Sequence, residues 1–272
     1  MLSRPSDPGV TFWRDGVQFP IDVLMPDEVA QGLAALDRFL HAPPALRTSL
    51  LAHKSHLVSR VLYDLVRSPT ILRHIEPLLG PDILAWASDF FIKEAGSPKF
   101  VSWHQDATYW GLTPDDVITA WVALTPSTVM SGCLKVIPGT HRLPILPHTP
   151  TFEVQNMLSR GQTIETGLAE SQAVDVVLAP GQMSLHHVKI AHASGPNRSS
   201  ERRVGFAIRY IAAHVRQERV STDAATLVSG ANRHGNFVLE PSPKGELDPD
   251  DIAHHQASWA IEQQAIAATE RQ

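Results

Sequence analysis

Apolar residues recur every three or four positions through much of the first eighty residues, a spacing typical of amphipathic helices. The clearest segment runs over 27–40, where Asp27 is a plausible N-cap. A second helix is predicted across 55–66. A third begins at Ser68, a capping residue followed directly by proline, and ends at Gly80.

From residue 82 onward the pattern changes to that of short β-strands. The predicted strands are rich in Val, Ile, Phe and Trp and are separated by Gly, Pro, Asn or Ser. They cover 83–92, 100–104, 117–124, 134–137, 173–178, 183–192 and 203–212. Short strands without long helices between them predict an antiparallel barrel or jelly roll. Ala- and Gln-rich residues from 250 to about 269 predict a final helix.

No flexible linker separates the helical segment from the strands, so a single domain is predicted. In this interpretation residues 1–81 are mainly helical and pack on the barrel, residues 82–215 form the jelly-roll core, and residues 216–272 are a C-terminal extension. The fold class expected is therefore mainly β with flanking helices. Two domains, one helical and one of strands, are the alternative that this order of elements also allows.

Composition narrows the class of partner. The 23 basic and 28 acidic side chains give a net charge of −5, which argues against a general binder of nucleic acid or of anionic membranes. Cys133 is the only cysteine, so neither a disulfide framework nor a cysteine zinc site is expected. No apolar stretch is long enough to span a bilayer, and the N-terminus lacks the apolar core of a signal peptide. We expect a cytoplasmic protein with a small-molecule substrate, and the composition specifies no oligomeric state.

A His-x-Asp segment is the first candidate for chemistry. In a strand, His104 and Asp106 project from the same face and could take adjacent positions on a metal. Two histidines and one carboxylate on one face of an octahedron are the ligands of non-haem Fe(II) oxygenases. A third ligand must come from a distant strand, and the residues alone leave His186, His187 and His192 open. The remaining histidines of this region, His141 and His148, lie in loop-like sequence and are expected to be solvated.

From Lys93 to Tyr210 the chain resembles the phytanoyl-CoA dioxygenase family. The resemblance rests on motifs in the family's order: His104-Gln-Asp106, Trp121-Val-Ala-Leu124, Gly132-Cys-Leu-Lys-Val-Ile-Pro-Gly-Thr-His141, His192-Ala-Ser-Gly-Pro-Asn197 and Arg203. Thr140 stands where serine is usual in the family. The resemblance implies a double-stranded β-helix (a cupin-like jelly roll) with Fe(II) held by His104, Asp106 and His192.

The same resemblance implies a cosubstrate site for 2-oxoglutarate, whose distal carboxylate a guanidinium can grip. Arg203 matches the family's arginine, and Ser194 shares the parity of His192. Family positions around the cosubstrate also fall on Lys93, Gln105 and Trp121. The strand pattern supports this independently. Small residues alternate with Arg203 on one face, and large apolar residues lie on the other.

The implied activity is that of a 2-oxoglutarate-dependent dioxygenase, which couples O2 to the oxidation of a substrate C–H bond and releases succinate and CO2. Hydroxylation, cyclisation and desaturation are all compatible with it, and secondary metabolism is the expected setting. A non-catalytic β-barrel that binds metal or a small ligand is the alternative from another class. A halogenase is disfavoured because Asp106 is present where halogenases carry a small residue.

Three residues are candidates for contacting the substrate. Tyr109 and Trp110 follow the metal segment, and Arg209 shares the face of Arg203. Between residues 141 and 173 strand periodicity is lost, and connections of this length are often lids or binding loops. Its apolar residues, such as Leu143 and Phe152, suggest that the loop packs. We therefore expect it to close over the substrate.

Overall fold

The computed structural model describes residues 8–158, 161–164 and 169–269. The chain forms two compact units, each assembled from separated stretches. The first unit takes Met1–Leu24, Phe91–Trp110 and Ile118–Gly205, and the second takes Met25–Phe90, Gly111–Val117 and Phe206–Gln272. These boundaries differ from the expected ones near residues 81 and 215, because contacts between distant segments define compact units. The single-domain organisation stays a prediction.

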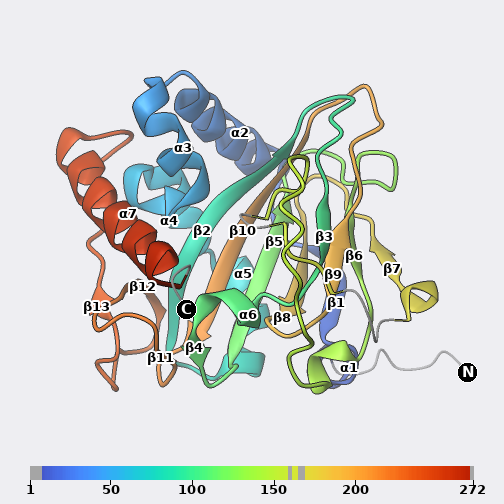
Figure 1. The fold of residues 1–272 in the computed structure, drawn as a ribbon. Coiled ribbons are helices and arrows are strands. Elements are labelled where there is room, and N and C mark those ends of the chain that lie inside the picture. Colours follow the sequence, from blue (N-terminus) through green and yellow to red (C-terminus); the bar gives the residue numbers. More distant parts are fainter. Residues whose placement is uncertain (1–7, 159–160, 165–168, 270–272) are drawn as a thin grey trace, which may run out of the picture. The chain divides into compact units, whose positions relative to one another are not determined.

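The first unit holds two antiparallel groups of strands (Figure 1). In one group β1, β8, β5 and the start of β10 lie side by side, and in the other the order is β3-β9-β6-β7. Its elements are α1 (Pro8–Asp15), β1 (Val17–Asp22), β3 (Val101–His104), α6 (Ala107–Trp110), β5 (Val117–Ala123), β6 (Leu134–Val136), η2 (Thr140–Arg142), η3 (Glu170–Gln172), β7 (Val174–Val176), β8 (Gln182–His187) and β9 (His192–Ser194).

One predicted strand of this unit is wrong in its extent. The segment expected over 183–192 divides into β8 and β9, because the chain turns at 188–191, where Ile190 N–H donates to His187 O. The division places β8 beside β5 and β9 beside β3 and β6, so the two strands belong to different sheets. His187, at the end of β8, and His192, at the start of β9, therefore belong to different sheets.

The second unit is richer in helices. Strands β10, β2, β12 and β13 follow one another in its sheet, and strands β2 and β10 each continue into residues of the first unit. Its elements are α2 (Pro26–Leu40), α3 (Pro44–Ala52), η1 (Ser55–Val58), α4 (Arg60–Val66), α5 (Pro69–Leu79), β2 (Ile83–Lys93), β4 (Leu112–Thr113), β10 (Arg203–Ala212), β11 (Arg216–Gln217), β12 (Ala224–Ser229), β13 (Val238–Leu239) and α7 (Pro249–Thr269). A core of multi-stranded sheets accompanied by several helices confirms the expected fold class, mainly β with flanking helices.

The first residues of α2 and α5 show how the local sequence determines where a helix begins. The helix expected from Asp27 begins one residue earlier, with Pro26 in its first turn. Its N-cap is Met25, whose backbone N–H donates to the Glu28 carboxylate at 2.7 Å. Glu28 therefore satisfies a backbone donor that an Asp27 N-cap would have left to water. The start of α5 at Ser68 and Pro69 is confirmed.

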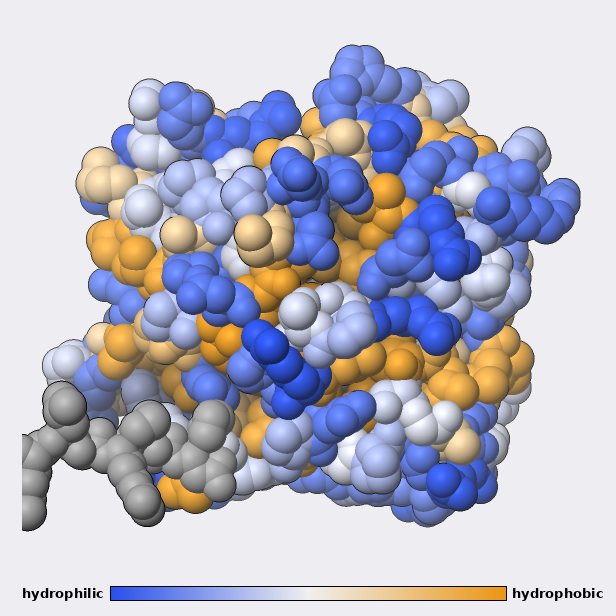
Figure 2. Space-filling model, turned by 180° about the vertical axis from the view of Figure 1, so that it is seen from behind, coloured by the Kyte–Doolittle hydropathy of each residue, from blue (hydrophilic) through white to orange (hydrophobic). Residues whose placement is uncertain are grey.

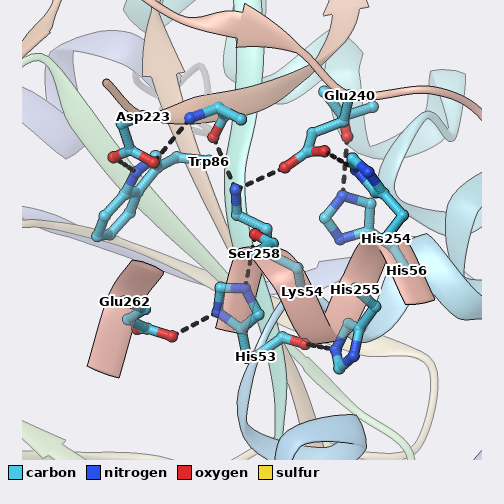
Figure 3. A network of polar contacts seen from close by, with 12 residues as sticks. His53, Lys54, His56, Trp86, Asp223, Glu240, His254, His255, Ser258 and Glu262 are labelled. Atoms are coloured by element: carbon cyan, nitrogen blue, oxygen red, sulfur yellow. Dashed lines mark hydrogen bonds and ion pairs between the residues drawn. The ribbon is translucent and has the colours of Figure 1, made fainter. Parts of the chain in front are cut away.

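A buried polar network fastens α7 to the residues around η1 within the second unit (Figure 3). The Lys54 ammonium donates to Glu240 Oε1 and to Ala224 O, both at 2.8 Å, and the other Glu240 oxygen pairs with His254 of α7. The side chains of Lys54 and Glu240 are only 4% and 1% exposed. A charge pair so deeply buried is costly to break, so it fixes how α7 packs.

Among the described residues, no helix is both long and apolar enough to cross a membrane. The face seen in Figure 2 interleaves hydrophilic side chains with smaller hydrophobic areas.

Candidate metal centre

Strand register brings two histidines together in the first unit. β3 pairs antiparallel with β9, and in that register His104 lies directly opposite His192. Directly opposed side chains on one face of a sheet are neighbours, and the two imidazole centroids are 4.0 Å apart. Asp106 follows β3 after one intervening residue and immediately precedes α6. Two strand residues and one residue at a helix start therefore converge.

The three side chains present ligand atoms at metal-binding separations. Asp106 Oδ1 lies 3.3 Å from His104 Nε2 and 3.8 Å from His192 Nε2. All three ligand atoms lie within 4.8 Å of one another. Neighbouring corners of an octahedron with bonds of ~2.1 Å are about 3 Å apart, so small adjustments would let one ion contact all three. The set is the two-histidine, one-carboxylate face of non-haem Fe(II) sites.

Backbone carbonyls fix the tautomer of both histidines. His104 Nδ1 is 2.9 Å from Ser102 O, and His192 Nδ1 is 3.0 Å from Ile190 O. A carbonyl only accepts, so each Nδ1 carries the proton and each Nε2 lone pair is directed toward Asp106. Such hydrogen bonds behind metal-binding histidines orient the ring and raise its basicity.

The electrostatics favour the metal-binding protonation states. Burial, reinforced by His104, lowers the pKa of His192 well below its usual value, so this ring is neutral at neutral pH. Burial alone would raise the pKa of the Asp106 carboxyl. The facing His192 and His104 outweigh burial, and the pKa of Asp106 lies below its usual value. A neutral imidazole beside an ionised carboxylate is the state that a divalent cation requires.

The other histidines take other places. His141 is only 5% exposed and its Nε2 is 3.1 Å from Trp13 O, so the expectation that it is solvated is wrong. His148 is half-buried and accepts the Gln105 backbone N–H at 3.0 Å. Both lie in loop sequence, but each caps a backbone group that would otherwise be buried without a partner. His187 contacts the rings of Trp13 and His141, away from the three candidate ligands.

A buried cationic cluster occupies the same unit. The Arg203 side chain is 3% exposed and lies over the Trp121 ring, 5.3 Å from its centroid. A Cβ at Gly205 would overlap that indole, so glycine is needed where β10 passes Trp121. The Arg203 guanidinium donates to Gly132 O at 2.7 Å, while its Nε is buried and has no partner among the described residues. Arg203 and Gly205, which were expected on one face of their strand, both lie against Trp121, and a cosubstrate role for these residues stays a prediction.

Lys93 adds a second positive charge beside Arg203. Its side chain is fully buried and donates to Ser194 Oγ at 2.7 Å and to the backbone oxygens of Ser194 and Gly195. Burial, reinforced by the charge of Arg203, lowers the pKa of Lys93 to about 7. Burial also lowers the pKa of Arg203, to about 10. Neither side chain forms an ion pair with an acidic residue in the described part of the chain.

Two buried cations without a carboxylate are unfavourable unless an anion joins them. Arg203 keeps an unpartnered buried Nε. Lys93 donates to Ser194, which lies two residues after His192 on β9. A dicarboxylate with one end on a metal and the other on a guanidinium suits this arrangement. The residues present therefore fit both Fe(II) and 2-oxoglutarate.

The phytanoyl-CoA dioxygenase (PhyH) profile matches residues 12–205, well over half of the chain. The chain belongs to the phytanoyl-CoA dioxygenase family. A probable alpha-ketoglutarate-dependent hypophosphite dioxygenase of Stutzerimonas stutzeri is 32% identical over 58% of this chain and 55% of its own length. The peroxisomal phytanoyl-CoA dioxygenase of Homo sapiens is 32% identical over 53% of this chain and 44% of its own. The chain thus matches about half the length of these two relatives.

Solved structures extend the likeness over nearly the whole chain. The apo form of the non-haem monooxygenase ThoJ has a TM-score of 0.88 at 35% identity and covers 97% of this chain and 99% of its own. CytC3 with Fe(II) and alpha-ketoglutarate has a TM-score of 0.65 at 25% identity, covering 90% and 96%. These likenesses confirm the expected cupin-like oxygenase fold.

The resemblance to the family places Gln105 beside the cosubstrate, whereas in the structure its side chain bonds to two backbone groups. Its side-chain nitrogen donates to Lys189 O and its oxygen accepts the Leu146 N–H, both at 2.8 Å. Gln105 thereby joins the metal segment to the 143–158 loop and to the turn before His192. These contacts give it a positioning role, and direct contact with a cosubstrate stays a prediction.

The loop after His141 lies along the strand that carries His104. Met157 N–H donates to Phe100 O at 2.8 Å, Ile164 N–H to Trp103 O at 2.9 Å, and Asn156 Nδ2 to Ser102 Oγ at 2.8 Å. The expectation that its apolar residues pack is wrong for several of them. Leu143, Ile145 and Phe152 are 40%, 48% and 73% exposed. Residues 159–160 and 165–168 lie outside the described part of the chain.

The three candidate substrate residues have different surroundings. The Tyr109 ring lies 6.1 Å from the His104 ring and meets His148 edge-on at 5.8 Å. Trp110 ends the same short helix and is half-buried. Arg209 lies in the second unit, where it pairs with Asp89, so its charge is already balanced. Contact of any of them with substrate stays a prediction.

Proposed function

We propose that this protein is an Fe(II)- and 2-oxoglutarate-dependent dioxygenase that oxidises a C–H bond of a small molecule, with release of succinate and CO2. The observation that carries the proposal is a pair of buried cations, Arg203 and Lys93, that have no acidic partner among the described residues, in the same unit as the set of three candidate metal ligands. A protein that only bound a metal would gain nothing from a desolvated Arg203 and Lys93, so the alternative of a non-catalytic binding barrel is disfavoured.

Each group has a part in this reaction. His104, Asp106 and His192 would hold the iron, and Arg203 over Trp121 would hold the distal carboxylate of 2-oxoglutarate. Together, the metal and cosubstrate supply an oxidant strong enough to take hydrogen from an unactivated carbon. The protein's share is to orient the ligands through the Ser102 and Ile190 carbonyls and to keep the cosubstrate end away from water. Asp106 occupies the carboxylate position, which disfavours a halogenase.

Relatives support a role in secondary metabolism. The 1-deoxypentalenic acid 11-beta-hydroxylase of Streptomyces exfoliatus is 27% identical over 82% of this chain and 78% of its own length. We propose hydroxylation or oxidative cyclisation of a compound of comparable size, in the cytoplasm. Cys133 is compatible with a reducing compartment, because it is buried, and burial raises the pKa of its thiol to about 11.

The test is succinate formation by the iron-loaded protein from 2-oxoglutarate and O2. The expected result is slow uncoupled turnover that increases when a candidate substrate is added. Asp106→Ala should abolish it, because one of three ligands is lost, while an exposed control such as Asp64→Asn should not. The proposal is wrong if the wild-type protein consumes no 2-oxoglutarate, or if Asp106→Ala consumes it as fast.

A further inference from the structure

A row of polar side chains lies on one buried face of β5 and β8. Thr119, Ser184 and His186 are 2%, 0% and 3% exposed. Their antiparallel register pairs Thr119 with His186 and Trp121 with Ser184, so these four side chains share one face. On the opposite face of β5 the residues are apolar: Ile118, Ala120 and Val122.

None of the three polar residues has its hydrogen bonds satisfied. Thr119 Oγ1, Ser184 Oγ and His186 Nδ1 are buried and have no partner among the described residues. Buried polar atoms are nearly always hydrogen-bonded in native proteins, because burying one alone is unfavourable. Three such atoms on adjacent positions of one face indicate that a polar ligand lies against them.

The row runs between the cationic cluster and the metal ligands. At one end Arg203 lies over Trp121, whose cross-strand partner is Ser184. Two residues further along β8, a step of about 7 Å, is His186. The His186 ring lies 5.3 Å from the ring of His192. A short chain that reached from the metal ligands to Arg203 would therefore pass this face.

We propose that His186 binds 2-oxoglutarate directly and donates its ring N–H to the metal-binding, oxo-acid end, while Thr119 and Ser184 contact the rest of the molecule. The inference rests on the proposed function. His186 is placed at the metal end because its ring contacts that of His192. A neutral imidazole carries one N–H, and the buried Nδ1 of His186 has no partner among the described residues, so this ring has a hydrogen bond to offer.

The sharpest test separates the two ends of the cosubstrate. Protein loaded with Mn(II) would be titrated calorimetrically with 2-oxoglutarate and with 2-oxobutyrate, which keeps the oxo-acid end and lacks the distal carboxylate. Mn(II) binds the same ligand types without turnover, so the readout is affinity alone. His186→Phe should weaken both acids by the same factor, about tenfold or more, because a hydrogen bond to a charged group is lost.

Two variants control for structure. His186→Gln keeps a side-chain donor and should recover part of the affinity. His187→Phe changes the adjacent ring, which points to the other face of the strand and contacts other aromatic rings, and should leave both affinities unchanged. Arg203→Met should weaken 2-oxoglutarate strongly and 2-oxobutyrate little, since it acts at the distal end.

Each outcome decides one claim. If His186→Phe binds Mn(II) and both acids as the wild type does, the inference about His186 is overturned and the proposed function stands. If it weakens Mn(II) itself, or affects only 2-oxoglutarate, His186 does not act at the oxo-acid end and the inference fails too. If the Mn(II)-loaded wild type binds neither acid, or Arg203→Met changes nothing, the proposed function fails instead.

Discussion

At the scale of single residues, both candidate histidine ligands are oriented by the same local device. Each ring donates through Nδ1 to the carbonyl two positions earlier in the chain, Ser102 for His104 and Ile190 for His192. Ser102 lies in β3, and Ile190 lies in the turn that precedes β9. The metal-facing nitrogen is therefore set by the local backbone before each histidine.

His192, and not His187, should be required for metal binding. His192→Ala removes a ligand atom that lies 3.8 Å from Asp106, whereas His187→Ala removes a ring packed against Trp13 and His141. Loss of a hydrogen-bond partner behind a ligand typically costs about 10- to 100-fold in metal affinity, so loss of the ligand itself should cost at least about a hundredfold. Fe(II) or Ni(II) affinity, measured by equilibrium dialysis, should fall by this factor for His192→Ala only. Retention of metal by His192→Ala and its loss by His187→Ala would contradict the assignment.

The affinity for 2-oxoglutarate should fall as pH rises through neutrality. Lys93 has a pKa of about 7, because burial and Arg203 oppose its charge. Below that pH it is protonated and attracts a dianion. Above it, binding must first restore the proton, so affinity declines by up to about tenfold per pH unit until the pKa of the bound state is reached. Calorimetric titration of Mn(II)-loaded protein between about pH 6 and 9 measures this.

Lys93→Met is the matched control for the pH profile. It keeps the length of the side chain and removes its titration, so its affinity should be lower at pH 6 and nearly flat across the range. A slope that persists in Lys93→Met would assign the effect to another group.

Strand parity is a local property, so the sequence alone indicated His104 and Asp106 as candidate ligands. His192 and Arg203 were selected by the resemblance to the family. Sequence reasoning did not single out Thr119, Ser184 or His186 as a group. Their signal was present, since Ser184 and His186 alternate with Met183 and Leu185. Recognising it required knowing that β8 pairs with β5, and the register of distant strands cannot be read from either strand alone.

At the scale of elements, the helix α7 depends on charges buried beneath it. Glu240 accepts from Lys54 and from His254, and its own carboxyl is almost fully buried. Sequence reasoning predicted α7 from its composition, and its residues 250–269 were correct to within one position. Composition did not indicate the network, because its members come from three separate stretches of the chain.

Glu240→Gln should destabilise the protein by about 3–5 kcal/mol, since it leaves the Lys54 charge buried without its partner. Urea unfolding followed by circular dichroism measures the change. Asp64→Asn removes the exposed carboxylate of the Arg60–Asp64 pair and should cost less than about 1 kcal/mol. Replacing both partners, Lys54→Met with Glu240→Leu, should recover much of the loss.

The stabilisation that Glu240 contributes should depend on pH. Burial alone would raise the pKa of Glu240, but Lys54 and His254 outweigh it and hold this pKa below the usual value. Its stabilisation is therefore present above the unfolded pKa of about 4.5 and is lost as pH falls through the lower folded value. The difference between wild type and Glu240→Gln should shrink in acid. An undiminished difference in acid would locate the effect elsewhere.

At the scale of the whole molecule, the two compact units are interleaved in the sequence. The chain passes from one unit to the other at five points, after residues 24, 90, 110, 117 and 205. The sequence predicted helices first and strands afterwards, and that order is broadly seen. The division into compact units could not be predicted, because it depends on contacts between distant segments, such as the Arg38–Glu246 pair, which lies 208 residues apart in the sequence.

Metal and cosubstrate should stabilise the fold together more than either does alone. A bound metal ion would compensate the buried negative charge of Asp106, and 2-oxoglutarate would compensate the buried positive charges of Arg203 and Lys93. At a hundredfold excess over its dissociation constant, a ligand adds about 2.7 kcal/mol to stability. Thermal melts with Mn(II), with 2-oxoglutarate and with both should show the largest rise in Tm for the pair. In Arg203→Met the increment from 2-oxoglutarate should vanish while that from Mn(II) remains.

The close approach of Gly205 to Trp121 offers a route to redesign. The indole fills the volume that a side chain at position 205 would need, and Arg203 rests on its face. Under the proposed function, a smaller ring at position 121 would let the Arg203 guanidinium move toward it. The space for the acid would then be longer. Trp121→Phe should then accept 2-oxoadipate, one carbon longer, in preference to 2-oxoglutarate. Such an enzyme would turn over slowly with the 2-oxoglutarate of the cell, and added 2-oxoadipate would control its activity.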